Sequence, residues 1–356
     1  MRPRWSRADG ADADRPKIQA GTDRVGDACR VGSFRAAGWS LAGSPRVFPP
    51  MGEVRIISAP FHAGALNVRV GAGPGRLLAD GLEQGLHSAG LATSLVIIAP
   101  VDDFEGEIGR SFEIKRRIAA AVAEARADGA FPVVLAGNCN AEVGTWSGLG
   151  DEDAGLIWFD AHPDFDTPDE HRSGYLDGMG LATLAGQCWR NLAATIPGFR
   201  PFDVARLVYC GIRDFGPGQW EKVEAAGIRA AVGSVESETD YAPLFEAALE
   251  DPPFERASIH LDVDCLDTSV GIANEYAAPG GLGVAELHAC LAIACAAAQP
   301  LSLTIASFNP NLEGAERISA AAIDAAISVA TAAARPSDPA STGGPFRADA
   351  REGRSG

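Results

Sequence analysis

Several features of membrane and exported proteins are missing from this sequence. No apolar run in its 356 residues approaches the roughly 20 residues that a membrane-spanning helix needs. Residues 1–16, MRPRWSRADGADADRP, are charged but contain no apolar segment, so they do not resemble a secretory signal. With 46% hydrophobic residues, the chain can still form a large core, and we expect one large α/β domain or two smaller ones.

Closely paired cysteines and an excess of basic residues are also missing. The seven cysteines are scattered, without the spacing of a disulfide framework, which indicates reduced thiols and a cytoplasmic protein. The formal net charge is −17 and the isoelectric point is about 4.8, so nucleic acids and anionic membranes are poor partners. An acidic protein of this kind is compatible with a cationic ligand.

The two ends of the chain differ in composition from its middle. Residues 1–52 are rich in Arg, Asp, Gly and Ala without a sustained period, and we expect a flexible, disordered extension there, with Met51 as an alternative start of the protein. Residues 335–356 are rich in Pro, Ser and Gly, which predicts a disordered tail. The expected folded domain therefore covers residues 53–334, and it shows no internal repeat.

Short apolar runs alternate with helical patterns through this domain. Residues 112–129 have a helical pattern that Gly129 closes, and residues 284–298 form a second helical stretch. Near-continuous apolar strands separated by amphipathic helices are typical of a parallel sheet covered on both faces. We therefore predict an α/β fold, with strands at 54–60, 94–100, 131–137, 155–162, 206–212, 257–264 and 302–308.

Polar residues and residues that bind metals gather where three of these strands end. Asn-Cys-Asn (138–140) follows the first of them, Asp-Ala-His-Pro-Asp (160–164) the second, and Asp-Val-Asp (262–264) the third. Ligands of open parallel sheets bind at the carboxyl ends of the strands. The sequence therefore places its chemically active residues at the edge of the sheet where a ligand is expected.

Alternation along an extended strand would put Asp160 and His162 on one face, and Asp262 and Asp264 likewise. If the strands are neighbours, four carboxylates and an imidazole face one point, where unpaired charges would repel one another. One or two divalent cations remove that repulsion, and this ligand set suits Mn²⁺. The alternative is that Asp160 and Asp262 only cap helices or begin turns.

The motifs DAHPD (160–164) and SIHLDVDCLD (258–267) resemble the two metal-binding signatures of the arginase/agmatinase (ureohydrolase) superfamily. The similarity covers nearly all of the folded part, including segments 56–82, 134–148 and 307–314. It implies a three-layer α/β/α domain with a mostly parallel central sheet, binuclear manganese, and a homotrimer or homohexamer. The Gly-Asn-Cys-Asn form at 137–140 resembles the branch that includes hydroxyarginine hydrolases.

The resemblance also implies roles for the strand-end residues. Asp160 and Asp262 would bridge two ions, His162 and Asp264 would complete the ligands of one ion, and Asp164 would contribute to the other. The implied reaction is the hydrolysis of a guanidine or amidine, in which water activated by the ions attacks the carbon and urea or an analogue leaves.

The sequence departs from this family at a metal ligand. The family's G-G-D-H supplies a histidine to the first ion, and the matching residue here is Cys139. A thiolate suits Mn²⁺ poorly, so we expect either weaker binding or a softer metal at this position. The alternative is that Cys139 is a small buried side chain and not a ligand.

Two further departures concern proton transfer and substrate. The family's proton-shuttling histidine matches Asp177, a poor general acid near neutral pH, and His171 either substitutes for it or is a solvated loop residue. The glutamate that holds the guanidinium matches Ser307, which carries no charge. Either Asp177 or Asp166 compensates, or the substrate is not an ordinary guanidinium.

Three loop residues match positions that contact the amino-acid end of the substrate in arginases: Asp166, Ser173 and Asp214. Their alternative role is ordinary loop polarity. Asp166 stands where an asparagine is usual and would repel an α-carboxylate, which disfavours free arginine. A small cationic guanidino or amidino compound fits these charges better. For His260 the sequence leaves two alternatives: it approaches the metal, or it is packed in the core.

The leading hypothesis is a metal-dependent hydrolase of a linear, non-peptide C–N bond in a guanidino, hydroxyguanidino or amidino compound. Asp177 is its best candidate for proton transfer, with Ser307 among the residues expected around the substrate. The alternative is a catalytically silent relative that binds a metal or ligand as a regulatory subunit. Retention of all five core ligands favours the enzyme, because a silent protein has no chemical reason to keep such a charge cluster.

Overall fold

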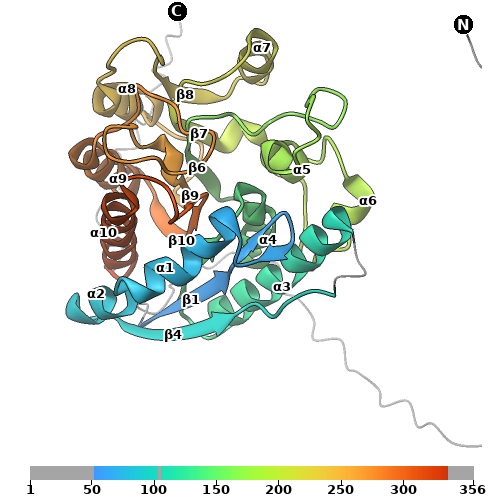
Figure 1. Ribbon diagram of the computed structural model, residues 1–356, viewed down its shortest axis with the longest axis vertical. Helices are drawn as coiled ribbons and strands as arrows, with labels where there is room; N and C mark the ends of the chain where they lie inside the picture. Colours follow the sequence, from blue (N-terminus) through green and yellow to red (C-terminus); the bar gives the residue numbers. More distant parts are fainter. Residues whose placement is uncertain (1–51, 103–105, 336–356) are drawn as a thin grey trace, which may run out of the picture. The chain divides into compact units, whose positions relative to one another are not determined.

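The structure, a computed structural model, describes residues 52–102 and 106–335. Within this part of the chain, eight strands form one parallel sheet in the order β4-β1-β5-β10-β9-β6-β7-β8 (Figure 1). The strands are β1 (Glu53–Ala59), β4 (Ala92–Ile97), β5 (Phe131–Ala136), β6 (Gly155–Phe159), β7 (Leu207–Ile212), β8 (Arg229–Val232), β9 (Arg256–Asp262) and β10 (Gln299–Ala306). Strands β2 (Phe61–His62) and β3 (Ala65–Leu66) form a separate antiparallel pair.

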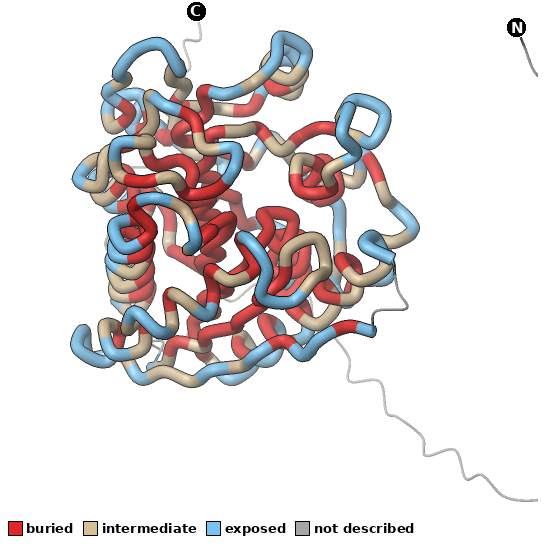
Figure 2. The backbone as a smooth tube through the Cα atoms, in the orientation of Figure 1, coloured by how far each residue is buried: buried red, intermediate tan, exposed pale blue. Residues whose placement is uncertain are grey.

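Helices cover both faces of the sheet, and each face has its own hydrophobic core. One core contains residues of α1 (Gly73–Ala79), α2 (Leu82–Ser88), α8 (Tyr241–Ala248), α9 (Val284–Ala297) and α10 (Ala315–Ala333). The other contains residues of α3 (Glu107–Ala127), α4 (Glu142–Leu149), α5 (Gly180–Leu184), α6 (Arg190–Ala193) and α7 (Pro217–Ala225). The central strands between them are buried along their length (Figure 2). The predicted α/β/α layering with a parallel sheet is confirmed.

The predicted strands are all present, with ends that differ by a few residues. The sequence missed β8, because its four residues lie at the sheet edge and only one of them is buried. The predicted helix 112–129 lies largely within α3, and Gly129 follows it with a φ of 76°, a conformation that glycine adopts without strain. The strands predicted at 155–162 and 257–264 end earlier, at Phe159 and Asp262.

Five short 3₁₀ helices complete the described secondary structure: η1 (Arg69–Ala72), η2 (Cys139–Ala141), η3 (Asp177–Met179), η4 (Val204–Arg206) and η5 (Val263–Cys265). Of these, η2 follows β5 and η5 follows β9, so both lie at the carboxyl edge of the sheet. Within the described ranges, no helix is both long and apolar enough to cross a membrane. The predicted extension (1–52) and tail (335–356) lie outside the described residues, except for Gly52 and Arg335.

Helices α3 and α4 pack closely because two glycines of α4 face the backbone of α3. A Cβ atom on Gly144 would lie 2.7 Å from the Lys115 carbonyl oxygen, and one on Gly148 would lie 2.5 Å from that of Ala119. Both distances are too short for a side chain. The contact fixes α4, which begins directly after η2, the short helix that carries Cys139.

We predict that Gly148→Ala destabilises the protein by about 1–3 kcal/mol, because the added methyl group must push α3 and α4 apart. Chemical denaturation of wild type and variant measures the difference. The matched control is Gly218→Ala in α7, where an added Cβ meets nothing within 4 Å. This control should be neutral or stabilising. An unfolding midpoint of Gly148→Ala at or above that of wild type would contradict the packing argument.

Candidate metal centre

The carboxyl ends of β6 and β9 lie side by side and bring two aspartates together. Phe159 pairs with Leu261, so Asp160 and Asp262 follow on neighbouring strands. The residues beyond them are not extended: Asp164 has a φ of 47°, and Asp264 lies in η5. The expected strand alternation is therefore wrong as a reason for the clustering.

Two matching turns produce the clustering instead. The Asp160 carboxylate accepts the backbone N–H of His162 at 2.7 Å, and the Asp262 carboxylate accepts that of Asp264, also at 2.7 Å. A carboxylate that binds the N–H two residues ahead folds the chain back on itself. Each strand end thereby presents both of its side chains to the same point.

The first group of ligand atoms comes from Asp160, His162 and Asp264, whose atoms lie within 4.8 Å of one another. His162 Nδ1 is 3.4 Å from Asp160 Oδ1 and 3.3 Å from Asp264 Oδ2. The other side of the ring faces Asp214, with His162 Nε2 3.6 Å from its Oδ2. Asn274 donates to Asp264 at 3.0 Å and fixes the orientation of its carboxylate.

The second group consists of Cys139, Asp164 and Asp177, also within 4.8 Å of one another. The Cys139 thiol donates to Asp262 Oδ2 at 2.7 Å, and its sulfur lies 3.2 Å from Ser307 Oγ. The Cys139 thiol therefore points toward a carboxylate, although the residue is also buried within one of the two hydrophobic cores.

The cluster carries more negative charge than its own cationic group balances. Burial and the neighbouring carboxylates raise the pKa of Asp160, Asp164 and Asp262. Burial opposes protonation of His162, but the surrounding aspartates raise its pKa well above the usual value, and His162 in turn holds the pKa of Asp264 low. One imidazolium cannot balance these carboxylates. Divalent cations would, so the residues present fit a metal centre.

Asp177 is held firmly beside the second group. Asn138 Nδ2 donates to one carboxylate oxygen at 2.7 Å, and the backbone and side-chain N–H groups of Asn140 donate to the other at 2.8 and 3.1 Å. Burial raises the pKa of Asp177, while these hydrogen bonds oppose the rise. Asp177 stays a prediction as a proton-transfer residue, and as a member of the second group its carboxylate could also hold an ion.

A pocket with an empty volume of about 730 Å³, open to solvent, lies above the cluster. The stacked rings of Tyr175 and Tyr276, whose centroids are 5.6 Å apart, form one wall, with Glu275 beside them. Most of the predicted site residues line this pocket: His162, Asp164, His171, Ser173, Asp177, Asp214, Asp262, Asp264 and Ser307.

Three predicted site residues do not line the pocket. Cys139 and Asp160 lie beneath its floor, and both are buried. Asp166 is also buried, where its Oδ2 is 2.8 Å from His171 Nδ1 and accepts from Gln219 at 2.8 Å. The Asp166 carboxylate is therefore bound by His171 and Gln219. His171 lines the pocket with Asp166 as its partner and is not a solvated loop residue.

The sequence reasoning missed Asn274, Trp158 and Glu142. Trp158 Nε1 donates to Asp160 Oδ2 at 2.8 Å, and Glu142 lies 1% exposed at the start of α4. An acidic residue beginning an otherwise apolar helix, EVGTWSGL, is a signal that could have identified Glu142. No comparable sequence signal marks Asn274, which lies in a loop ten positions after its partner.

Comparison with known proteins agrees with the fold and with the motifs. The sequence matches the Arginase family over residues 52–332. An arginase from Glaciozyma antarctica is 30% identical over 294 residues, 76% of this chain and 85% of that protein. An arginase from Eremothecium gossypii is 34% identical over 199 residues, 50% of this chain, and the match spans 49% of the length of that relative.

Solved structures share the architecture. The crystal structure of arginase from Bacillus subtilis superposes with a TM-score of 0.68 at 21% identity, covering 78% of this chain and 98% of that one. The chain has the α/β/α fold of the ureohydrolases, with groups at its strand ends that can bind metal. It belongs to the Arginase family.

A buried lysine lies behind Asp177 on α3. Lys115 is 2% exposed and donates to Ser111 Oγ at 2.6 Å, and Ser111 in turn contacts Asn140, which binds Asp177. Burial lowers the pKa of Lys115 to about 7, although Asp177 opposes the shift.

We predict that Lys115 contributes stability that rises between about pH 7 and pH 10, because the unfolded chain still binds the Lys115 proton there and the folded chain does not. Lys115→Met should remove most of this rise, and Ser111→Ala, which keeps the amine, should retain it. Urea unfolding across this pH range measures the slope. An unchanged slope in Lys115→Met would show that Lys115 stays protonated in the fold.

Proposed function

We propose that this protein is a metal-dependent hydrolase of a linear, non-peptide C–N bond in a small guanidino, hydroxyguanidino or amidino compound. The observation that carries the proposal is the pair of ligand groups at the carboxyl edge of the sheet, with Asp262 in contact with Cys139 of the second group. Membership of the Arginase family supports the same chemistry. A homotrimer or homohexamer is the assembly we expect.

The side chains divide between two ions in this proposal. Asp160 and Asp262 would be shared between them, His162 and Asp264 would complete one set of ligands, and Asp164 and Cys139 would contribute to the other. Mn²⁺ suits the first set, and the thiol favours a softer metal in the second. Bound ions would lower the pKa of water and neutralise the carboxylates.

The chain's own groups orient the substrate. Ser307 brings no charge to the pocket floor, so a cation must be held by the acids and rings of the walls. Asp214, Glu275 and Tyr276 line the pocket and would supply two carboxylates and an aromatic ring. Ser173, at the pocket rim, is available as a hydrogen-bond partner for the far end of the substrate.

Proton transfer falls to Asp177 or His171. Asp177 lies at the second ligand group, where an adjacent leaving amine would take up a proton, and its pKa is raised by burial. His171 is in the same pocket and is oriented by Asp166. Asp177→Asn and His171→Gln, made one at a time, show which of the two residues transfers the proton, because neither amide titrates.

A second candidate, a metal-binding protein without turnover, is favoured by the three hydrogen bonds that immobilise Asp177. A carboxylate satisfied by three N–H donors is a poor proton carrier, because every transfer breaks part of this network. Urea or ammonia release from a panel of guanidino and amidino compounds by the Mn²⁺-loaded protein distinguishes the two functions.

We predict that Asp262→Asn abolishes both metal binding and hydrolysis while leaving the metal-free fold as stable as wild type or more so. The raised pKa of Asp262 shows that its charge is costly in the fold, and asparagine removes that charge at constant size. Calorimetric Mn²⁺ titration of stripped protein gives the stoichiometry, and thermal unfolding gives the stability.

The matched control is Asp324→Asn on the exposed side of α10, which should keep the metal content, activity and stability of wild type. Retained Mn²⁺ in Asp262→Asn would refute the assigned site. Wild-type metal binding without product from any compound of the panel would favour the second candidate.

A further inference from the structure

A buried histidine beneath the metal centre has an unused nitrogen. His260 is 0% exposed on β9, and within the described part of the chain its Nε2 has no hydrogen-bond partner. Leaving a buried ring nitrogen unpaired costs free energy comparable to a lost hydrogen bond. This nitrogen, on the strand that also carries Asp262, is therefore available to bind a ligand.

The other nitrogen of His260 is held by a carboxylate. His260 Nδ1 lies 3.4 Å from Glu142 Oε2, and Glu142 Oε1 accepts from Ser258 Oγ at 2.8 Å. Glu142 comes from the start of α4, directly after the segment that carries Cys139. A carboxylate on one ring nitrogen orients the imidazole and fixes its tautomer, which is the usual support of a histidine that binds metal through the other nitrogen.

Trp158 holds the ring from the side. The two rings stack with centroids 3.8 Å apart and an angle of 25°, and the same indole donates to Asp160. Trp158 thus fixes His260 and Asp160 relative to each other. Neither group can turn away without breaking a buried contact.

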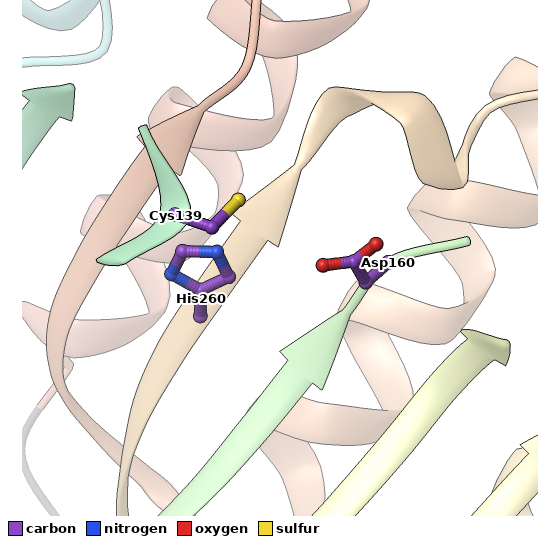
Figure 3. Close-up of side chains that lie close together, drawn as sticks. All are labelled: Cys139, Asp160 and His260. Atoms are coloured by element: carbon purple, nitrogen blue, oxygen red, sulfur yellow. The ribbon is translucent and has the colours of Figure 1, made fainter. Parts of the chain in front are cut away.

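The unused nitrogen faces the metal centre. Ligand atoms of Cys139, Asp160 and His260 lie within 4.8 Å of one another, all three residues being buried (Figure 3). Cys139 comes from η2 after β5, Asp160 from the end of β6 and His260 from β9 between them (Figure 3). Ligands of a tetrahedral ion with bonds of about 2.0–2.3 Å lie roughly 3.3–3.7 Å apart. Side-chain shifts of about 1 Å would close the set.

We propose that His260 is a ligand of the ion held by Cys139, giving that ion a thiolate, an imidazole and the Asp160 carboxylate. This donor set is the one that Zn²⁺ prefers, whereas the oxygen-rich set around His162 suits Mn²⁺. The inference rests on the proposed metal centre and makes it a mixed one, with a softer ion on the buried side.

The test is zinc X-ray absorption on metal-stripped protein loaded with one equivalent of Zn²⁺. We expect one sulfur at about 2.3 Å together with imidazole scattering. In His260→Gln the imidazole signal should disappear from the sulfur-bound zinc, and the zinc affinity should fall at least about tenfold. Zinc without sulfur in wild type, or unchanged affinity and imidazole scattering in His260→Gln, would overturn the proposal.

Two further variants keep the proposal testable if His260→Gln does not fold. Glu142→Gln keeps the size of the side chain but weakens the support of His260, and it should lower zinc affinity about 10–100-fold. The control is His288→Gln on α9, a helix whose buried residues pack in the core on the opposite face of the sheet. It should bind zinc as wild type does. Unchanged affinity in Glu142→Gln would also count against the proposal.

The measurement is independent of turnover, so the two proposals can fail separately. An inactive protein with zinc bound by sulfur and imidazole would support the ligand assignment and refute the hydrolase. An active protein whose zinc has no imidazole from His260 would support the hydrolase and refute the ligand assignment.

Discussion

The repulsion among buried carboxylates at the ends of β6 and β9 is the constraint on which the rest of this structure depends. Asp160 and Asp262 must face each other because their strands are neighbours with fixed register. Burial raises the pKa of both, so the fold keeps a cluster that costs stability unless cations fill it. Such a cost is understandable as part of a functional site.

The layers around the sheet serve this cluster in different ways. The close contact of α3 with α4, which Gly144 and Gly148 permit, fixes the helix that begins at Glu142. Loops on the other side of the carboxyl edge bring Asn274 to Asp264 and build the tyrosine wall of the pocket. The cluster therefore has a rigid, buried underside and an open upper side, which suits ions held below a small ligand.

Three residues that the sequence analysis expects to differ from the family pattern lie near one another. The Cys139 sulfur and Asp177 belong to the second ligand group, and Ser307 Oγ lies 3.2 Å from that sulfur. Asp177 is hydrogen-bonded to Asn138 and Asn140, on either side of Cys139, and Cys139 contacts Ser307. The three side chains therefore belong to one connected network, which supports the proposal of a different ion on that side.

The sequence by itself determined the layers, all the strands of the sheet except β8 and the identity of most clustered side chains, because apolar periodicity and motif spacing are local properties of the chain. It gave the wrong reason for the clustering, since turns after Phe159 and Asp262, not strand alternation, direct the side chains. Only the tertiary structure decided that Asp166 is turned toward His171, that Asn274 supports Asp264, and that His260 faces Cys139 with Glu142 behind it. These contacts join residues from different strands and loops, and their geometry is set by packing that no single segment encodes.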